Sequence, residues 1–213
     1  MGTLNLGGGA SFIGGSNGFL ADAPSGTIIK TGSYYTGAGS GASTTSSSTS
    51  FYTININGSG QKLRNMTKAS DHVLAYNKIS NDSHLFINVE FPTYLDGGTN
   101  GMGFRVRLSV DGGSNYLYIP DNVTISDTNQ NSENSIWASW GLNGYGGHTA
   151  DHLSCKYTTD SYTANADTIR THTGEVRIYF EGKVHASGDT AYWISYSNSW
   201  AKAGYVYIEE VKN

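Results

Sequence analysis

The sequence predicts an all-β protein built as a jelly-roll-like, two-sheet sandwich. Apolar and polar residues alternate with a period of two in three segments, 85–91, 104–110 and 176–181. This alternation is typical of antiparallel strands with one buried face. Only 62–78 has any helical character, and its Asn, Thr, Ser and Asp residues argue against a helix. Since no helices alternate with the strands, the sequence excludes a βαβ architecture.

The remaining strands are expected from shorter or less regular patterns. They are 27–35, 51–57, 116–119, 136–140, 191–196 and 205–211. The turn-forming residues 111–115, Asp-Gly-Gly-Ser-Asn, predict a hairpin between 104–110 and 116–119. The low-complexity Gly, Ala, Ser and Thr residues of 37–50 predict a long surface loop.

The sequence divides into a Gly-rich N-terminal arm, residues 1–25, and a β-sandwich domain, residues 26–213. So much Gly makes a regular helix in the arm unfavourable. We predict an assembly arm, which lies either on its own domain or on a neighbouring subunit. Its candidate contact residues are the scattered apolar ones: Leu4, Leu6, Phe12, Ile13, Phe19 and Leu20.

Composition favours a protein that works through its surface. Charged residues make up 14% of the 213 residues, against a typical value of about 25%, while 15 Tyr and 4 Trp supply packing material. The net charge of −4 and the lack of a Lys/Arg cluster argue against nucleic acid and anionic membranes as partners. No apolar run is long enough to span a bilayer, and the N-terminus lacks the features of a secretory signal.

The sequence contains several patterns that resemble metal-binding or catalytic sites, but loops, turns and solvated side chains explain them more simply. His148, Asp151, His152 and Cys155 resemble metal ligands, but they follow a Gly-rich stretch, which favours a polar loop. The Asp-Gly-Gly sequences at 96–98 and 111–113 are explained by turns rather than calcium loops. Four carboxylates on strand-like segments, which could pair only in space, are expected to be solvated: Glu175, Glu181, Glu209 and Glu210. We therefore predict no catalytic residue, no metal and no cofactor.

Large aromatic residues crowd the C-terminal half of the chain. Tyr and Trp join an apolar body to a polar tip, which suits subunit interfaces and sugar stacking as well as the core of a sandwich. The candidates for an interface or a glycan-facing surface are Trp137, Trp140, Tyr145, Trp193 and Trp200.

Several stretches in a fixed order carry a family resemblance. They are 27–35 with 51–56, 78–89 with 103–113, and 174–182 with 192–195 and 205–211. Together they resemble the β-sandwich domain of structural proteins in the virions of marine bacteriophages, cyanophages especially, of capsid-decoration or tail-fibre type. That domain is similar in outline to the trimeric jelly rolls of the tumour-necrosis-factor and complement type. The resemblance covers about residues 27–211 and breaks down at 61–76 and 121–166.

The resemblance implies a non-enzymatic virion structural protein, a homotrimer on the outer surface of the particle. It implies a capsid decoration or cement protein, made in the host cytoplasm without a signal peptide, with the major capsid protein or tail components as partners. One alternative is a short tail fibre or knob that binds host-surface glycans. A more remote one is a glycan-active enzyme on the same scaffold.

Overall fold

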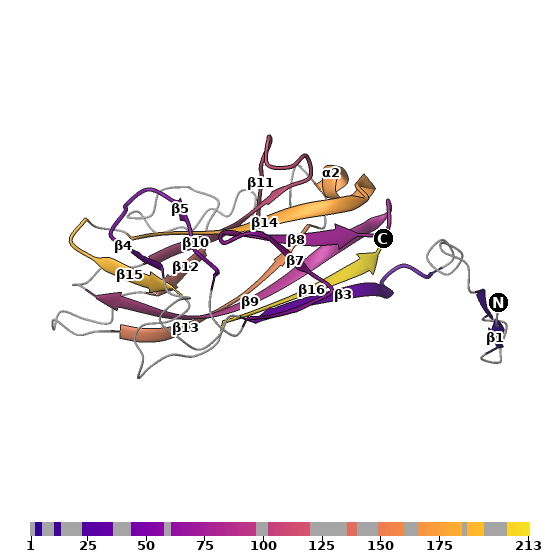
Figure 1. Ribbon diagram of the computed structural model, residues 1–213, viewed down its shortest axis with the longest axis horizontal. Helices are drawn as coiled ribbons and strands as arrows, with labels where there is room; N and C mark the ends of the chain where they lie inside the picture. The colour runs from indigo at the N-terminus through magenta and orange to yellow at the C-terminus, as the bar shows by residue number, and fades with distance from the viewer. Residues whose placement is uncertain are drawn as a thin grey trace.

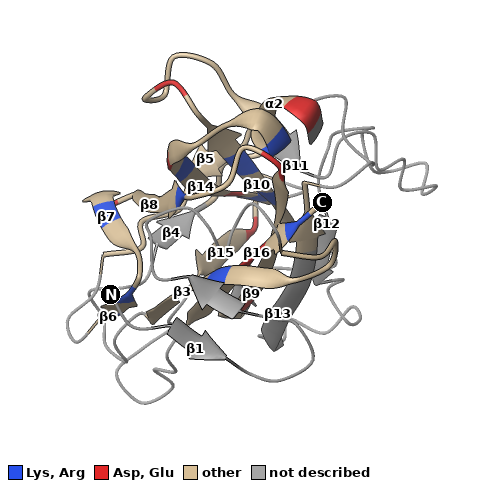
Figure 2. Ribbon diagram, turned by 90° about the vertical axis from the view of Figure 1, so that its right-hand side faces the viewer, with Lys and Arg blue, Asp and Glu red and all other residues tan. Residues whose placement is uncertain are grey.

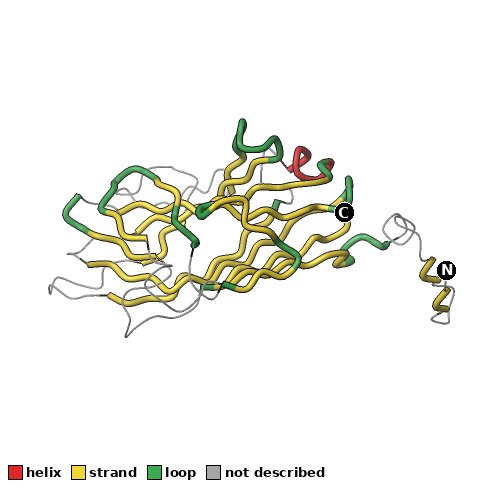
Figure 3. Tube along the Cα trace, viewed as in Figure 1, coloured by secondary structure: helices red, strands yellow, loops and turns green. Residues whose placement is uncertain are grey.

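The computed structural model describes residues 3–5, 11–13, 23–35, 44–57, 61–96, 102–119, 136–139, 149–159, 166–184, 187–193 and 204–213. Two antiparallel sheets face each other in these residues, which confirms the predicted sandwich (Figures 1 and 3). The β9 sheet contains, in spatial order, β4 (Thr44–Ser46), β15 (Thr190–Trp193), β9 (Ser83–Asp96), β16 (Tyr205–Lys212), β3 (Ile28–Tyr35) and β6 (Lys62–Arg64), with β13 (Thr149–Thr158) also paired to β9.

The β14 sheet forms the second layer. It contains, in spatial order, β11 (Leu117–Ile119), β10 (Met102–Ser109), β14 (Gly174–Val184), β8 (Val73–Lys78) and β7 (Thr67–Ser70), with β12 (Ile136–Ser139) paired to β10 and β5 (Tyr52–Thr53) paired to β14. The chain changes sheet between β8 and β9, between β9 and β10, and again between β13, β14 and β15. This repeated crossing wraps the chain around one core, as in a jelly roll.

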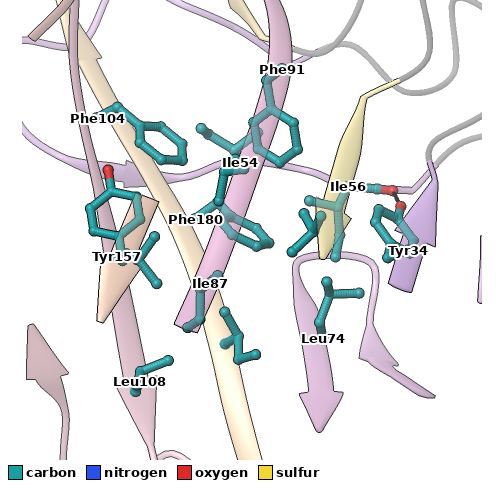
Figure 4. Packing of buried hydrophobic residues seen from close by; sticks show 14 of the residues in the cluster. Tyr34, Ile54, Ile56, Leu74, Ile87, Phe91, Phe104, Leu108, Tyr157 and Phe180 are labelled. Atoms are coloured by element: carbon teal, nitrogen blue, oxygen red, sulfur yellow. Dashed lines mark hydrogen bonds between the residues drawn. The ribbon is translucent and has the colours of Figure 1, made fainter. Parts of the chain in front are cut away.

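The three strongest sequence patterns form the centre of this core. Alternate residues of β9, β10 and β14 point into the space between the sheets, and their apolar side chains are fully buried. Phe91 packs edge-on against Phe180, with ring centroids 5.2 Å apart, and Phe104 lies 5.9 Å from Phe91. Figure 4 shows these rings between the layers, together with Ile54 and Ile87. Edge-to-face contacts of this kind add to the stabilisation that burial gives.

A glycine allows the two sheets to approach at one end of the sandwich. The indole of Trp193, in β15, lies over Gly182 of β14, so closely that a Cβ atom there would be 2.6 Å from the ring. Trp193 is fully buried, and its Nε1 donates a hydrogen bond of 2.5 Å to the Tyr52 hydroxyl. A side chain at position 182 would therefore force the ring out of its site.

A buried ion pair connects the sheets elsewhere in the sandwich. Lys78 of β8 and Glu210 of β16 have fully buried side chains, with 4.0 Å between Nζ and Oε1. The Lys78 ammonium donates to the carbonyls of Ser80, Arg170 and His172. Burial lowers the pKa of Lys78 to about 8, and the neighbouring Glu210 charge opposes that shift.

Glu210 is also satisfied by hydrogen bonds. Its carboxylate accepts from the backbone N–H groups of Ile79 and Ser80 and from the Ser83 hydroxyl, 2.7 Å away. A buried charge is tolerated when it is both paired and hydrogen-bonded. The network therefore fixes the β8–β9 connection against the C-terminal strand.

Residues 62–78 contain the strands β6, β7 and β8, which agrees with the argument against a helix there, and Leu74 and Tyr76 face the core with a period of two. Two sequence predictions need correction. Within the expected loop 37–50, Thr44–Ser46 forms β4 by pairing with β15. Of 51–57 only Tyr52–Thr53 pairs as a strand, although the Ile54 and Ile56 side chains are buried. A six-residue helix, α2 (Ala166–Thr171), also lies outside the prediction.

The N-terminal segment contributes a separate two-stranded sheet. β1 (Thr3–Asn5) pairs with β2 (Ser11–Ile13), with Leu4 opposite Phe12. Leu6, Phe19 and Leu20 lie outside the described residues, so the predicted role of the arm stays a prediction. From Ala23, which is buried, the chain joins the sandwich, and Gly26 N–H donates to the Lys212 carbonyl at 2.8 Å.

We expect Gly182→Ala to lower the free energy of unfolding by about 1–3 kcal/mol, because the new methyl group overlaps the Trp193 ring. Urea denaturation followed by tryptophan fluorescence measures this loss. Gly188→Ala is the matched control, since a Cβ at position 188 meets no atom within 4 Å. Equal stability of the two variants would contradict the proposed contact.

Candidate functional site

The outer face of the β9 sheet carries a row of tyrosines. Tyr205 lies on β16 between Tyr35 of β3 and Glu90 of β9, and Tyr207 follows two residues later. Their strand neighbours Tyr34, Val206 and Ile208 are fully buried, so alternation turns these tyrosines outward. We call Tyr35, Tyr205 and Tyr207, with the charged residues beside them, the tyrosine face.

The tyrosine rings form a continuous surface. The Tyr35 and Tyr205 centroids lie 4.9 Å apart with the rings tilted by 53°, and Tyr207 is nearly parallel to Tyr205 at 6.3 Å. Tyr35 is 36% exposed, and the other two are half-buried. Burial raises the pKa of Tyr205, helped by Tyr35, Tyr207 and the Glu90 charge, so the hydroxyl stays protonated. The surface is thus amphipathic, with apolar rings and polar tips.

Charges of opposite sign lie on the two sides of the tyrosine face. Lys62 and Arg64 of β6 are exposed beside Tyr35 and Ser33. Glu90 of β9 is exposed beside Tyr205, and Glu209 of β16 is half-buried beside Thr31. Within the described part of the chain, none of these four side chains forms an ion pair. The face therefore has a cationic and an anionic side.

The outer face of the β14 sheet carries a different set of side chains. The paired strands β10 and β14 place Arg105 opposite Glu181 and Arg107 opposite Tyr179. Lys183 and Arg177 extend the same outward row of β14 in both directions. Figure 2 shows Lys and Arg on these neighbouring strands. We call this row, with the rings that cover it, the arginine face.

Glu181 holds the centre of the arginine face. Its Oε2 accepts from Arg105 Nε at 2.7 Å, and its Oε1 lies 2.9 Å from Arg107 Nη2. The expectation that Glu181 is solvated was wrong, since the residue is only 4% exposed. The two guanidinium groups displace water from its carboxylate, which period-two alternation cannot reveal.

Aromatic rings cover both arginines. The Arg105 guanidinium lies 3.9 Å from the centroid of Phe51, and that of Arg107 lies 3.8 Å from Tyr116 and 4.7 Å from Tyr179. Tyr116 and Tyr179 meet edge to face at 5.4 Å. Stacking of this kind holds a guanidinium plane in a fixed orientation.

The hairpin at one end of the arginine face confirms the expected turn. β10 and β11 pair across it, and the Asp111 carboxylate accepts from Ser109, Ser114 and Asn115. These donors hold the pKa of Asp111 well below its usual range. The Asp111 carboxylate is therefore bound by hydrogen-bond donors of its own turn.

The structure places the other predicted site residues in different environments. Trp193 is not an interface or glycan-facing residue, because it packs over Gly182 in the core. Glu210 is buried rather than solvated, whereas Glu175 is 51% exposed on its side chain and pairs with Arg177 at 2.7 Å. Trp137 lies in β12, and Trp140, Tyr145 and Trp200 lie outside the described residues.

The expected metal-like cluster lies partly in a strand. Asp151, His152 and Cys155 belong to β13, which pairs with β9 along its length, so this part is not the predicted loop. His148 lies outside the described residues. Among the residues that the structure describes, no group of three His, Cys, Asp or Glu side chains could hold a metal ion.

The sequence indicated Tyr205 and Tyr207 only as members of the aromatic C-terminal half, and Glu181 only as a solvated carboxylate. It assigned no role to Arg105 or Arg107. The signal was present, because Arg105 and Arg107 occupy the polar positions of an alternating strand, as do Tyr205 and Tyr207. Which outward residues meet across strands depends on register, which the sequence does not state.

Comparison with known proteins gives no family. No protein-family model and no curated protein matches the chain. The carbohydrate-binding module TmCBM61, solved with β-1,4-galactotriose, is 10% identical over 93% of this chain and 96% of that chain, with a TM-score of 0.27. A structure of infectious bursal disease virus, Gx strain, is 11% identical over 88% of this chain and 39% of that chain, with a TM-score of 0.31. At these scores the likeness carries no inference.

Membrane insertion through a helix has no support in the described residues, where no helix is long and apolar enough to cross a bilayer.

We expect Glu181→Gln to lower the free energy of unfolding by about 1–3 kcal/mol, because two largely buried guanidinium groups lose their counter-charge. Glu175→Gln, on the same strand and face, removes an exposed pair and should change stability by less than about 0.5 kcal/mol. Chemical denaturation of both variants makes the comparison. Similar losses would show that Glu181 has no special place in the face.

Proposed function

We propose that this chain is a non-enzymatic structural protein that self-associates through its tyrosine face, as a homotrimeric capsid decoration protein on the outer surface of a bacteriophage particle. The observation that carries the proposal is the tyrosine face itself. Tyr side chains are enriched at protein interfaces, because they bury a large area at little conformational cost and keep a hydrogen-bonding tip.

The charge pattern of the tyrosine face supports contact between copies of this chain. The cationic side, with Lys62 and Arg64, complements the anionic side, with Glu90 and Glu209. Copies arranged head to tail around a closed ring would place the cationic side of one on the anionic side of the next. Such complementarity fixes the orientation of an interface and disfavours incorrect partners.

The assignment to a virus particle rests on the sequence resemblance. A decoration protein must present a folded, polar surface and bind the particle by its own contacts. The sandwich supplies the folded, polar surface, and the Gly-rich residues 1–25 are our candidate for the segment that binds the particle. Two of the carboxylates on the strands, Glu181 and Glu210, form structural ion pairs.

A short tail fibre or knob that binds host-surface glycans is the second candidate function. It is favoured by the arginine face, where the exposed ring of Tyr116 lies over a guanidinium group. Aromatic rings and planar cations are both suited to binding polar ligands with apolar faces.

Charge reversal tests self-association. The pair Lys62→Glu with Arg64→Glu makes both sides of the tyrosine face acidic, and Glu90→Lys with Glu209→Lys makes both basic. We expect a trimer for the wild type and monomers for each double variant in sedimentation velocity, because like charges then meet. The quadruple variant exchanges the two signs and should recover the trimer. A monomeric wild type, or double variants that still form trimers, would refute this interface.

Location on the particle tests the viral role. An antibody raised against the sandwich should mark the capsid of the encoding virus at positions that follow icosahedral symmetry. Electron microscopy of labelled particles reads out the positions. Label confined to the tail axis would move the tail-fibre function to first place, and unlabelled particles would remove both.

A further inference from the structure

We propose that one row of side chains on the tyrosine face selects the partner in self-association. In this row Lys62 of one copy pairs with Glu90 of the next copy, and the rings of Tyr35 and Tyr205 form the apolar part of the contact. The inference rests on the proposed self-association and names the residues that carry it. It also states which charges on the face decide the contact and which do not.

Strand register places these four residues in one line across the β9 sheet. Lys62 of β6 lies opposite Tyr35 of β3, and Tyr35 lies opposite Tyr205 of β16. Tyr205 in turn lies opposite Glu90 of β9. Directly opposite residues share a face of a sheet, so all four side chains point outward. Neighbouring strands lie about 4.8 Å apart, so three strand spacings separate the Lys62 and Glu90 backbones by about 14 Å.

The charges at the two ends of this row have no partner in their own copy. Lys62 and Glu90 are exposed, and neither side chain forms an ion pair or a hydrogen bond with the residues that the structure describes. On the opposite sheet, by contrast, the exposed Glu175 pairs with Arg177 at 2.7 Å. Because two rings separate Lys62 from Glu90, the two charges cannot pair with each other. A second copy brings a charge of opposite sign to each end.

The neighbouring rows of the tyrosine face lack this combination of charges. Arg64 begins the next row, which ends on the neutral side chain of Asn88. Glu209 lies in a third row, where its paired neighbours are Thr31 and Phe86. Among these three rows, only the first has opposite charges at its two ends. Copies that meet with their rows aligned therefore pair cation with anion in the first row alone.

The rings between the two charges supply the apolar part of the contact. Tyr35 is 36% exposed, and its ring centroid lies 4.9 Å from that of Tyr205, so the two rings form one surface. With a cation at one end and an anion at the other, the row has a direction. The contact therefore joins unlike ends, as in a closed ring of identical copies. Like charges that met at this contact would oppose it, which makes the row selective for the correct neighbour.

Sedimentation velocity of single charge reversals tests the row. Lys62→Glu makes both ends acidic and Glu90→Lys makes both ends basic, so we expect each to weaken self-association by about tenfold or more. A double variant with both changes reverses the direction of the row and should recover the trimer. Arg64→Glu and Glu209→Lys reverse the same charges in the neighbouring rows, and these matched controls should associate like the wild type. Thermal unfolding of each variant checks that it is folded.

Two tyrosines of closely matched exposure test the apolar part of the contact. Tyr35→Ala should weaken self-association by about tenfold or more, whereas Tyr116→Ala, which removes a ring that is 37% exposed on the opposite sheet, should not. A monomeric wild type would refute self-association itself. Equal losses in all four charge reversals would keep the tyrosine face as the interface but overturn the Lys62–Glu90 row. A trimer that survives Lys62→Glu or Tyr35→Ala, or a double variant that stays monomeric, would also overturn the row.

Discussion

The buried pair of Lys78 and Glu210 is the constraint on which the rest of the structure depends. One residue belongs to the β14 sheet and the other to the β9 sheet, so their attraction acts across the sandwich. Neither charge could be buried alone, and together they recruit backbone groups from the β8–β9 connection and from α2. The C-terminal strand β16 is thereby fixed in register. That strand carries Tyr205 and Tyr207, so a buried polar network positions an exposed aromatic surface.

The opposite end of the sandwich is fixed by packing instead of charge. Trp193 fills the space over Gly182 and reaches Tyr52 of β5 through its indole N–H. A large ring against a residue without a side chain brings the two layers close. Between these two contacts lies a core of Phe and aliphatic residues. The outward-facing positions are not needed to pack this core, so their side chains are free to serve other roles.

The two outer faces differ because their paired strands place the charged residues differently. On the β9 sheet, tyrosines lie between strands whose charges are separated, so the charges remain unpaired within the described chain. On the β14 sheet, opposite charges meet directly across β10 and β14, and rings cover the cations. The first arrangement suits the proposed head-to-tail contact, in which the cationic side of one copy meets the anionic side of the next. In the second arrangement Glu181 and Glu175 are bound by arginines of the same sheet.

The sequence by itself determined the all-β class, the central strands and the 111–115 hairpin, because alternation and turn chemistry are local properties. It could not determine that 62–78 forms strands, since polar residues obscured the period that places Leu74 and Tyr76 in the core. Only the tertiary structure decided that Trp193 is buried, that Glu181 lies between two arginines and that Glu210 pairs with Lys78. In each case the partner lies far along the chain, and strand register decides which distant residues meet.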